Sequence, residues 1–416
     1  MKASARIDPC KPEACCGMGN PGGLSGETPS TTVPAADDPD SAPGAALAAR
    51  RILLAITALG AGGAERVIIT LAHHLVAQGH RVTLLTFEAP GTAPYYPLRS
   101  DVELRQLGIP AGPSPLRRSL ERVRALRRAV RDCRPDVVIA FLVKVNVMMA
   151  LATRGLGVPL ILSERNNPER QEVDPLWSWL RARTYPLAHR VVTPSRGVLA
   201  CLPSAVQRRG RVIPNPVDHL PSPPLPSESR RIVAAGRLVP QKGFDLLLRA
   251  FAAVAPERPG WTLVIFGEGQ ERARLEQLRD ELGLADRVGM PGITAAPGQW
   301  VEDAEIFVLS SRFESFGNVV TEAMSAGLAV VSFDCPWGPG DIVRHEVDGV
   351  LVPPEDVAAL ADALRRLTAD RDLRRRLGNA ARTGVRRFAA EPIMGLWHEL
   401  IVDATRAGRR RPTGLG

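Results

Sequence analysis

Two glutamates, Glu314 and Glu322, stand eight positions apart, with Gly317 between them. An apolar run ends just before this stretch, and a short helix is expected to begin near Gly317 and to end at Gly327. Glu314 then precedes the helix, whereas Glu322 lies inside it. The first amides of a helix lack partners within it, so they form a site for an anion such as a phosphate. The amides concerned belong to Gly317, Asn318 and Val319.

Carboxylates beside an anion site are best matched by neutral hydrogen-bond donors. Sugar and ribose hydroxyls are good donors to carboxylates, so Glu314 and Glu322 are expected to accept hydrogen bonds from them. The alternative is that both glutamates are surface acids on an ordinary helix.

Two cations follow directly after a predicted strand over 232–235. Arg237 and Lys242 stand in a turn that begins and ends with glycine, and the chain contains only four lysines, at positions 2, 11, 144 and 242. At the carboxyl end of a strand both side chains are expected to point into a cleft. An arginine fork and a lysine point charge together suit a diphosphate. The alternative is a solvated charged turn.

A second glycine-rich turn, with glycines at 60, 62 and 63, follows an apolar run over 52–56. Glu65 stands where a dinucleotide-binding fingerprint would place its third glycine, which argues against a nicotinamide cofactor. Gly62 and Gly63 instead predict a tight turn whose amides approach a phosphate or another anion. The alternative is that these glycines only let the chain turn closely against the sheet.

Short apolar runs alternate with helical patterns, which is typical of parallel strands joined by helices. The predicted strands cover 52–56, 82–87, 137–141, 160–162, 191–192, 232–235, 263–266, 306–309, 328–333 and 350–352. The expected fold class is α/β, with two Rossmann-like domains facing across a cleft. Ligands of such sheets bind beyond the carboxyl ends of the strands, where the turns described above lie.

Composition divides the chain into five segments. Residues 1–49 are nearly devoid of bulky apolar side chains, which predicts a disordered tail. Two α/β domains are expected over 51–213 and 231–390, and a proline-rich linker over 214–230 joins them. The last segment, 391–416, is expected to form a C-terminal helix and tail.

The 416 residues carry a formal net charge of +9, nearly all of it from arginine. A basic excess favours anionic partners such as phosphates or acidic lipid surfaces. Nucleic acid is not an expected partner, because no aromatic platform is interleaved with the basic residues. No apolar run is long enough to cross a membrane, and the six cysteines show no zinc-ligand spacing, so no metal site is expected. Reduced cysteines favour a cytoplasmic location.

Eight arginines crowd a helix expected over 116–134. Its apolar side consists of Leu116, Leu120, Val123, Leu126 and Val130. One interpretation is a helix that rests on anionic headgroups at the inner face of the plasma membrane. The other is a helix whose apolar side joins the core and whose arginines are solvated.

Together these motifs resemble those of the retaining glycosyltransferases of family 4, which have the GT-B fold, and the resemblance covers nearly all of 51–405. It implies that Glu314 contacts the transferred sugar and that Glu322 holds the ribose. It also implies that Arg237 and Lys242 neutralise the leaving diphosphate without a metal. The further substrate-binding positions that it implies are Gly62, Gly63, Ser315, Phe316, Gly317, Asn318 and Val319.

The resemblance also implies an arrangement of the whole chain. The first domain binds the acceptor, the second binds the donor, and the C-terminal helix returns to the first domain. Segments 334–341 and 164–168 resemble those of polysaccharide and lipid-linked oligosaccharide members, with Asp341 in place of their glutamate. Many members carry a histidine near the reacting sugar, but the region after 141 has none, and Lys144 and Asn146 are candidates to fill that space.

The sequence therefore predicts an enzyme, a hexosyltransferase type of glycosyltransferase. Its expected reaction moves a hexose or N-acetylhexosamine from a nucleotide-diphosphate sugar, UDP-linked, to a saccharide or polyprenyl-linked acceptor in envelope or exopolysaccharide synthesis. No cofactor beyond this co-substrate is expected. Alternatives are a small-molecule acceptor, a sugar-nucleotide epimerase, a basic nucleic-acid-binding protein, and a module that binds UDP-sugar without transfer. Intact Glu314 and Lys242 argue against the last of these.

Overall fold

The computed structural model describes residues 49–109, 115–170, 174–217, 229–294 and 298–409. The predicted tail, apart from Ala49, and residues 218–228 of the predicted linker lie outside the described residues. The chain from Ala49 onward forms one compact unit, and it contains two parallel β-sheets.

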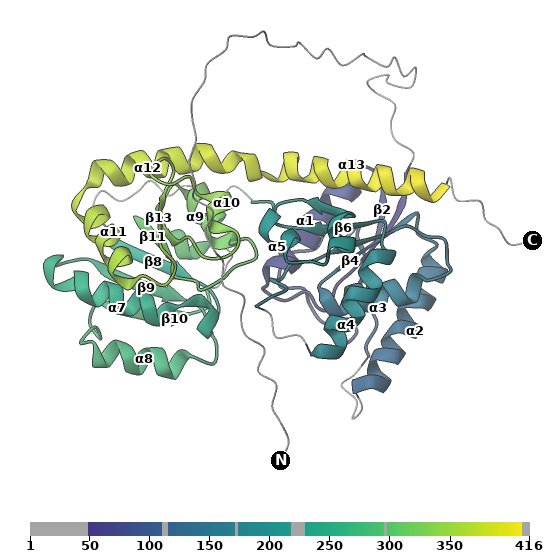
Figure 1. Ribbon diagram of the computed structural model, residues 1–416, viewed down its shortest axis with the longest axis horizontal. Coiled ribbons are helices and arrows are strands. Elements are labelled where there is room, and N and C mark those ends of the chain that lie inside the picture. The colour runs from purple at the N-terminus through teal and green to yellow at the C-terminus, as the bar shows by residue number, and fades with distance from the viewer. Residues whose placement is uncertain (1–48, 110–114, 171–173, 218–228, 295–297, 410–416) are drawn as a thin grey trace, which may run out of the picture. The chain divides into compact units, whose positions relative to one another are not determined.

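The first sheet has seven parallel strands within the described residues, in the order β3-β2-β1-β4-β5-β6-β7. Figure 1 labels β2, β4 and β6 among them. They are β1 (Arg51–Ala55), β2 (Arg81–Thr86), β3 (Glu103–Gln106), β4 (Val137–Phe141), β5 (Leu160–Ser163), β6 (Arg190–Thr193) and β7 (Gly210–Val212). Every apolar run predicted in this half is a strand. The edge strands β3 and β7 were not predicted, because they are short and alternate polar with apolar residues.

Helices cover both faces of the first sheet. They are α1 (Gly63–Ala77), α2 (Pro115–Cys133), α3 (Val143–Thr153), α4 (Pro175–Thr184), α5 (Arg196–Ala200), α6 (Ser204–Gln207) and the 3-10 helix η1 (Tyr185–Leu187). Helix α1 forms because Val67, Leu71 and Leu75 recur every four residues, which gives it one apolar face that packs on the sheet.

The second sheet has six parallel strands in the described part of the chain, in the order β10-β9-β8-β11-β12-β13. They are β8 (Arg231–Ala235), β9 (Thr262–Phe266), β10 (Val288–Gly292), β11 (Ile306–Leu309), β12 (Ala329–Phe333) and β13 (Val350–Val352). Its helices are α7 (Phe244–Val254), α8 (Arg272–Glu281), α9 (Asn318–Ala326), α10 (Pro339–Ile342), α11 (Val357–Ala369), α12 (Arg371–Gly384) and the 3-10 helices η2 (Pro240–Lys242), η3 (Ala255–Glu257), η4 (Gln299–Val301) and η5 (Val385–Phe388).

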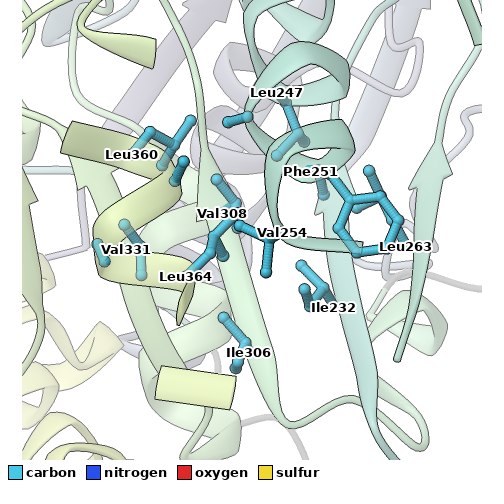
Figure 2. Packing of buried hydrophobic residues seen from close by; sticks show 14 of the residues in the cluster. Ile232, Leu247, Phe251, Val254, Leu263, Ile306, Val308, Val331, Leu360 and Leu364 are labelled. Carbon is cyan, nitrogen blue, oxygen red and sulfur yellow. The ribbon is translucent and has the colours of Figure 1, made fainter. Parts of the chain in front are cut away.

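One apolar layer fixes α7 and α11 on the second sheet. Figure 2 shows Leu247, Phe251 and Val254 of α7 meeting residues of the central strands. Leu360 and Leu364 of α11 pack over the neighbouring strands in the same cluster. Because the strands are held from this face, the loops at their carboxyl ends have a rigid base.

The C-terminal helix α13 (Ala390–Arg409) packs on the first sheet although it follows the second in sequence. Its ring of Trp397 is fully buried and stacks on Phe141 of β4, with 5.9 Å between ring centroids. The return of this helix to the first domain is as predicted.

The arginine-rich helix α2 gives its apolar side to the core. Leu126 and Val130 are buried in the cluster that underlies the first sheet, and Val123 packs against them. The core interpretation is therefore confirmed for these residues, and the apolar side is not free to rest on lipid. Leu120 remains exposed, and the Leu116 side chain lies outside the described residues. No helix among the described residues is long and apolar enough to cross a membrane.

Candidate active site

The strand order of the second sheet places two loops at its switch point. The chain leaves β8 toward β9 and β10 and then crosses back to β11 on the other side of β8. The loops that follow β8 and β11 therefore diverge and leave a crevice, which is where ligands bind in open α/β sheets. Arg237 and Lys242 stand in the loop after β8, and Glu314 stands in the loop after β11.

The helix after β11 begins where the sequence predicted. Gly317 caps α9 with φ of 106°, a left-handed conformation that favours glycine, and Gly327 ends the helix at φ of 78°. Within the helix, Asn318 and Val319 offer backbone N–H groups that have no acceptor in the preceding turn. The positive end of α9 thus faces the switch point of the sheet.

Lys242 and Glu314 form an ion pair, with 2.6 Å between Nζ and Oε1. Their side chains are only 15% and 8% exposed, and the hydroxyl of Ser311 donates to the same carboxylate oxygen at 2.8 Å. The hydroxyl of Ser310 donates to the carbonyl oxygen of Lys242 at 2.9 Å, which fixes the backbone of the turn. The sequence motifs predict both residues at the ligand, but no motif indicates that they bind each other.

Glu322 forms a second ion pair, and its partner is Arg66 in the first turn of α1. Both side chains are 12% exposed. The pair joins the first domain to the second. Arg66 belongs to none of the predicted site residues, although its position just after the glycine turn is a usable signal.

The glycine turn approaches the start of α9 closely. A Cβ on Gly63 would lie 2.5 Å from Nδ2 of Asn318, so a larger residue there would have to displace the Asn318 side chain. Asn215 donates from Nδ2 to Oδ1 of Asn318 at 2.7 Å. On Gly62, a Cβ would overlap the carboxylate of Glu65. Burial raises the pKa of Glu65, and the positive charge of Arg237 partly opposes this effect.

Ser315 and Phe316 make contacts within the protein. The hydroxyl of Ser315 donates to the carbonyl oxygen of Arg165 at 2.8 Å, and Ser195 donates to the carbonyl oxygen of Ser315 at 3.1 Å. The ring of Phe316 is buried edge-on against Phe388, with centroids 5.5 Å apart. Their side chains therefore hold the loop between β11 and α9 in place.

A cavity of about 260 Å³ lies beside these residues. Of the predicted site residues, Gly63, Arg237, Asn318, Val319 and Glu322 line it. Its other lining residues are Ala61, Arg66, Tyr95, Tyr96, Ala235, Gly236, Phe266, Gly267, Glu268, Ile293, Thr294, Gly298 and Trp300. The structure thus brings the diphosphate and ribose candidates together.

Six predicted site residues are not among those that line the cavity. They are Gly62, Lys242, Glu314, Ser315, Phe316 and Gly317. Lys242 and Glu314 nevertheless lie at the same switch point. Lys242 follows Arg237 in the loop after β8, and Glu314 lies between β11 and α9.

Neither candidate for the family histidine lines the cavity. Asn146 is fully buried, and its amide donates to the carbonyl oxygen of Ser163 at 3.0 Å and to the hydroxyl of Tyr185 at 2.9 Å. Lys144 is exposed, with Nζ 5.8 Å from the ring centroid of Trp177.

Two acidic residues of the subgroup motifs have raised pKa values. Tyr185 donates to the buried carboxyl of Glu164 at 2.8 Å, and burial raises the pKa of that carboxyl. Burial also raises the pKa of Asp341, and the positive charge of Arg196 partly opposes this increase. Among the described residues, no group of three or more His, Cys, Asp or Glu side chains could hold a metal ion.

Two family models match this chain in succession. The model described as Glycosyltransferase Family 4 matches residues 61–219, and the one described as Glycosyl transferases group 1 matches 218–384. The chain belongs to the GT-B glycosyltransferases of the family 4 type.

This glycosyltransferase resembles several characterised proteins. It is 28% identical over 364 residues, 86% of this chain and 99% of the relative, to the GalNAc-alpha-(1->4)-GalNAc-alpha-(1->3)-diNAcBac-PP-undecaprenol alpha-1,4-N-acetyl-D-galactosaminyltransferase of Campylobacter jejuni. It is 40% identical over 192 residues to an exopolysaccharide phosphotransferase of Streptomyces coelicolor; the match spans 46% of this chain and only 20% of that protein. The structure of Anabaena HepE in complex with UDP and glucose shares the fold, with a TM-score of 0.71, 20% identity, and coverage of 85% of this chain and 99% of HepE.

Proposed function

We propose that this glycosyltransferase moves a hexose or N-acetylhexosamine from a UDP-linked sugar to a saccharide or polyprenyl-linked acceptor, with retention of anomeric configuration, in envelope or exopolysaccharide synthesis. The main support is the cavity that gathers Arg237, Glu322 and the start of α9 at the switch point of the second sheet. The Campylobacter relative is named for an undecaprenol-linked acceptor, and the HepE structure contains UDP and glucose.

The residues of the second domain have complementary roles toward the donor. Arg237 and the first amides of α9 bind the diphosphate, whose negative charge they match. Glu322 accepts hydrogen bonds from the ribose hydroxyls. Glu314 accepts them from the transferred sugar. Lys242 uses one N–H for Glu314, and its ammonium group has two more for a phosphate oxygen.

The transfer exchanges one bond at the anomeric carbon. The bond to the donor phosphate oxygen breaks, and a bond to the acceptor hydroxyl oxygen forms on the same face. The departing phosphate oxygen takes the proton of that hydroxyl. The diphosphate gains negative charge as it leaves, so Arg237, Lys242 and the α9 amides stabilise the transition state more than the bound donor.

The reaction as proposed uses no metal ion, because two cationic side chains and a helix N-terminus supply the positive charge. The expected result is a transfer rate that does not change when a chelator removes divalent cations. A rate that falls with chelation and returns with added magnesium contradicts this part of the proposal.

A polyprenyl-linked acceptor brings the enzyme to a membrane, and the first domain exposes apolar and basic side chains of the kinds that contact lipids and anionic headgroups. Trp179, Leu176 and Leu187 are 54%, 51% and 59% exposed, on α4 and η1. Helix α2 adds exposed arginines along its length, such as Arg124 and Arg128. Each cation near an anionic surface adds on the order of 1 kcal/mol of attraction.

The experiment is incubation of the chain with a panel of nucleotide sugars and a membrane lipid extract, followed by mass analysis. Transfer gives an acceptor heavier by one sugar residue and an equal amount of free nucleoside diphosphate. The Lys242→Ala variant serves as the low-activity control. Interconversion of nucleotide sugars without a heavier acceptor would indicate an epimerase instead. Binding of UDP-sugar without any product would indicate a module that does not transfer.

A further inference from the structure

Tyr95 lies in the segment between β2 and β3, far in sequence from the motifs of the second domain, yet it lines the same cavity as Glu322. Its side chain is 40% exposed. No motif pointed to this residue.

Hydrogen bonds hold the Tyr95 segment against the glycine turn. The amide of Tyr95 donates to the carbonyl oxygen of Leu59 at 2.8 Å, and the amide of Leu59 donates to Glu88 at 3.1 Å. The ring of Tyr95 meets that of Tyr96 edge-on, with centroids 5.0 Å apart. Burial raises the pKa of Tyr96 to about 12, so its hydroxyl stays protonated. This hydroxyl donates to the carbonyl oxygen of Ala61 at 3.4 Å. The backbone hydrogen bond to Leu59 and the edge-on contact with Tyr96 therefore position Tyr95 beside the glycine turn.

The second domain supplies apolar side chains to the same cavity. Phe266 ends β9, Ile293 follows β10, and Trp300 lies in η4. Ile293 is 63% exposed, whereas Trp300 is buried against Phe307. Single exposed apolar residues are ordinary on a protein surface. Here two of them, Tyr95 and Ile293, come from different domains and line one cavity.

The position of Glu322 indicates what these apolar side chains meet. On the proposed function, Glu322 holds the ribose, and the base is joined directly to that ribose. The base must therefore lie within reach of the apolar part of the cavity. A planar heterocycle stacks well on an aromatic ring, and such stacking contributes to binding whichever base is present.

We propose that Tyr95 stacks on the base of the donor nucleotide, so that both domains hold the nucleoside. The proposal rests on the proposed function, because it takes Glu322 as the ribose contact. Tyr95 then acts as a binding residue for the base, while Arg237 and α9 bind the diphosphate.

The test is calorimetric titration of the full chain with UDP and, separately, with inorganic pyrophosphate, which has no base. Tyr95→Ala is expected to weaken UDP binding by about fivefold to a hundredfold and to leave pyrophosphate binding unchanged. Tyr95→Phe keeps the ring and is expected to bind UDP like the unmodified chain. Leu396→Ala, which changes an apolar side chain that is 40% exposed like Tyr95 but lies outside this cavity, is the matched control and is expected to change neither.

Either of two results overturns the proposal. Unchanged UDP affinity in Tyr95→Ala shows that the ring does not meet the base. Equal loss of UDP and pyrophosphate binding shows that the substitution disturbs the glycine turn. If the unmodified chain binds no nucleotide, the proposed function fails together with this inference; if it binds UDP and Tyr95→Ala binds it equally, only the inference fails.

Discussion

Glu314 and Glu322 are both ion-paired, but their partners come from different parts of the molecule. Lys242, the partner of Glu314, belongs to the same domain, and the fold of that domain alone brings the two together. Arg66, the partner of Glu322, belongs to the first domain, 256 positions away in sequence. The first pair is thus a feature of the donor domain, whereas the second exists only while the two domains lie together.

The two pairs differ in what a ligand must change. Lys242 can keep Glu314 and still donate to a phosphate, since an ammonium group has three N–H donors. Glu322 must share its oxygens between Arg66 and the ribose hydroxyls. We therefore expect loss of Lys242 to affect chemistry and loss of Arg66 to affect donor binding.

The largest effect is expected from Lys242→Ala. Loss of a group that stabilises transition-state charge should lower kcat by about tenfold to a thousandfold. Breaking a nearly buried ion pair also leaves Glu314 without its cation, which costs about 3–5 kcal/mol of unfolding free energy. Turnover and chemical denaturation measure the two effects separately.

The control for this variant is Lys242→Ala combined with Glu314→Gln. The double variant removes the unpaired charge, so stability should recover while turnover stays low. Near-normal turnover in either variant contradicts a catalytic role for Lys242.

Glu322→Gln should mainly weaken donor binding. A carboxylate makes stronger hydrogen bonds to hydroxyls than an amide does, and the difference is worth about 1.5 kcal/mol, or about tenfold in Kd. Titration with UDP measures the change. An unchanged UDP affinity would remove Glu322 from the ribose site.

Arg66→Met should have a smaller and opposite effect. Without Arg66, the Glu322 carboxylate is available to the ribose hydroxyls in a larger fraction of the molecules. UDP binding should therefore tighten by up to about fivefold. Arg274→Met, an exposed ion-paired arginine on α8, is the matched control. Weaker UDP binding in Arg66→Met would show that Arg66 contacts the ligand and does not compete with the ribose for Glu322. The two ion pairs would then not differ in the way described.

The smallest effect concerns α13, which packs on the first sheet. His80 stacks on His398 of α13, with ring centroids 5.8 Å apart. Burial lowers the pKa of both imidazoles below 6.5. The native state then binds fewer protons than the unfolded state between the lowered pKa and 6.5, so stability is full above pH 6.5 and falls as the pH drops through this range.

The thermal unfolding midpoint should accordingly be lower at about pH 5.5 than at about pH 7.5. Each kcal/mol of stability lost lowers it by about 2–4 °C. His398→Gln should flatten this dependence, and thermal denaturation at the two pH values measures it. An equal fall in His398→Gln and in the unmodified chain assigns the acid sensitivity to other groups.

Local sequence determined most of the fold. The buried strands are continuous apolar runs, and α9 lies between Gly317 and Gly327 because both adopt left-handed conformations. The strands missed were β3, β7 and β10, which lie at sheet edges. An edge strand has one partner and an exposed side, so its residues need not form an apolar run.

By itself, the sequence determined which chemical groups the molecule has at the ends of its strands: Arg237, Lys242, Glu314, Glu322 and the glycine turn. These follow from short motifs whose meaning depends only on neighbouring residues. The tertiary structure alone decided which groups meet. Arg66 reaches Glu322, and Tyr95 reaches the same cavity, because the packing of the two sheets and their loops sets distances between segments that share no local pattern.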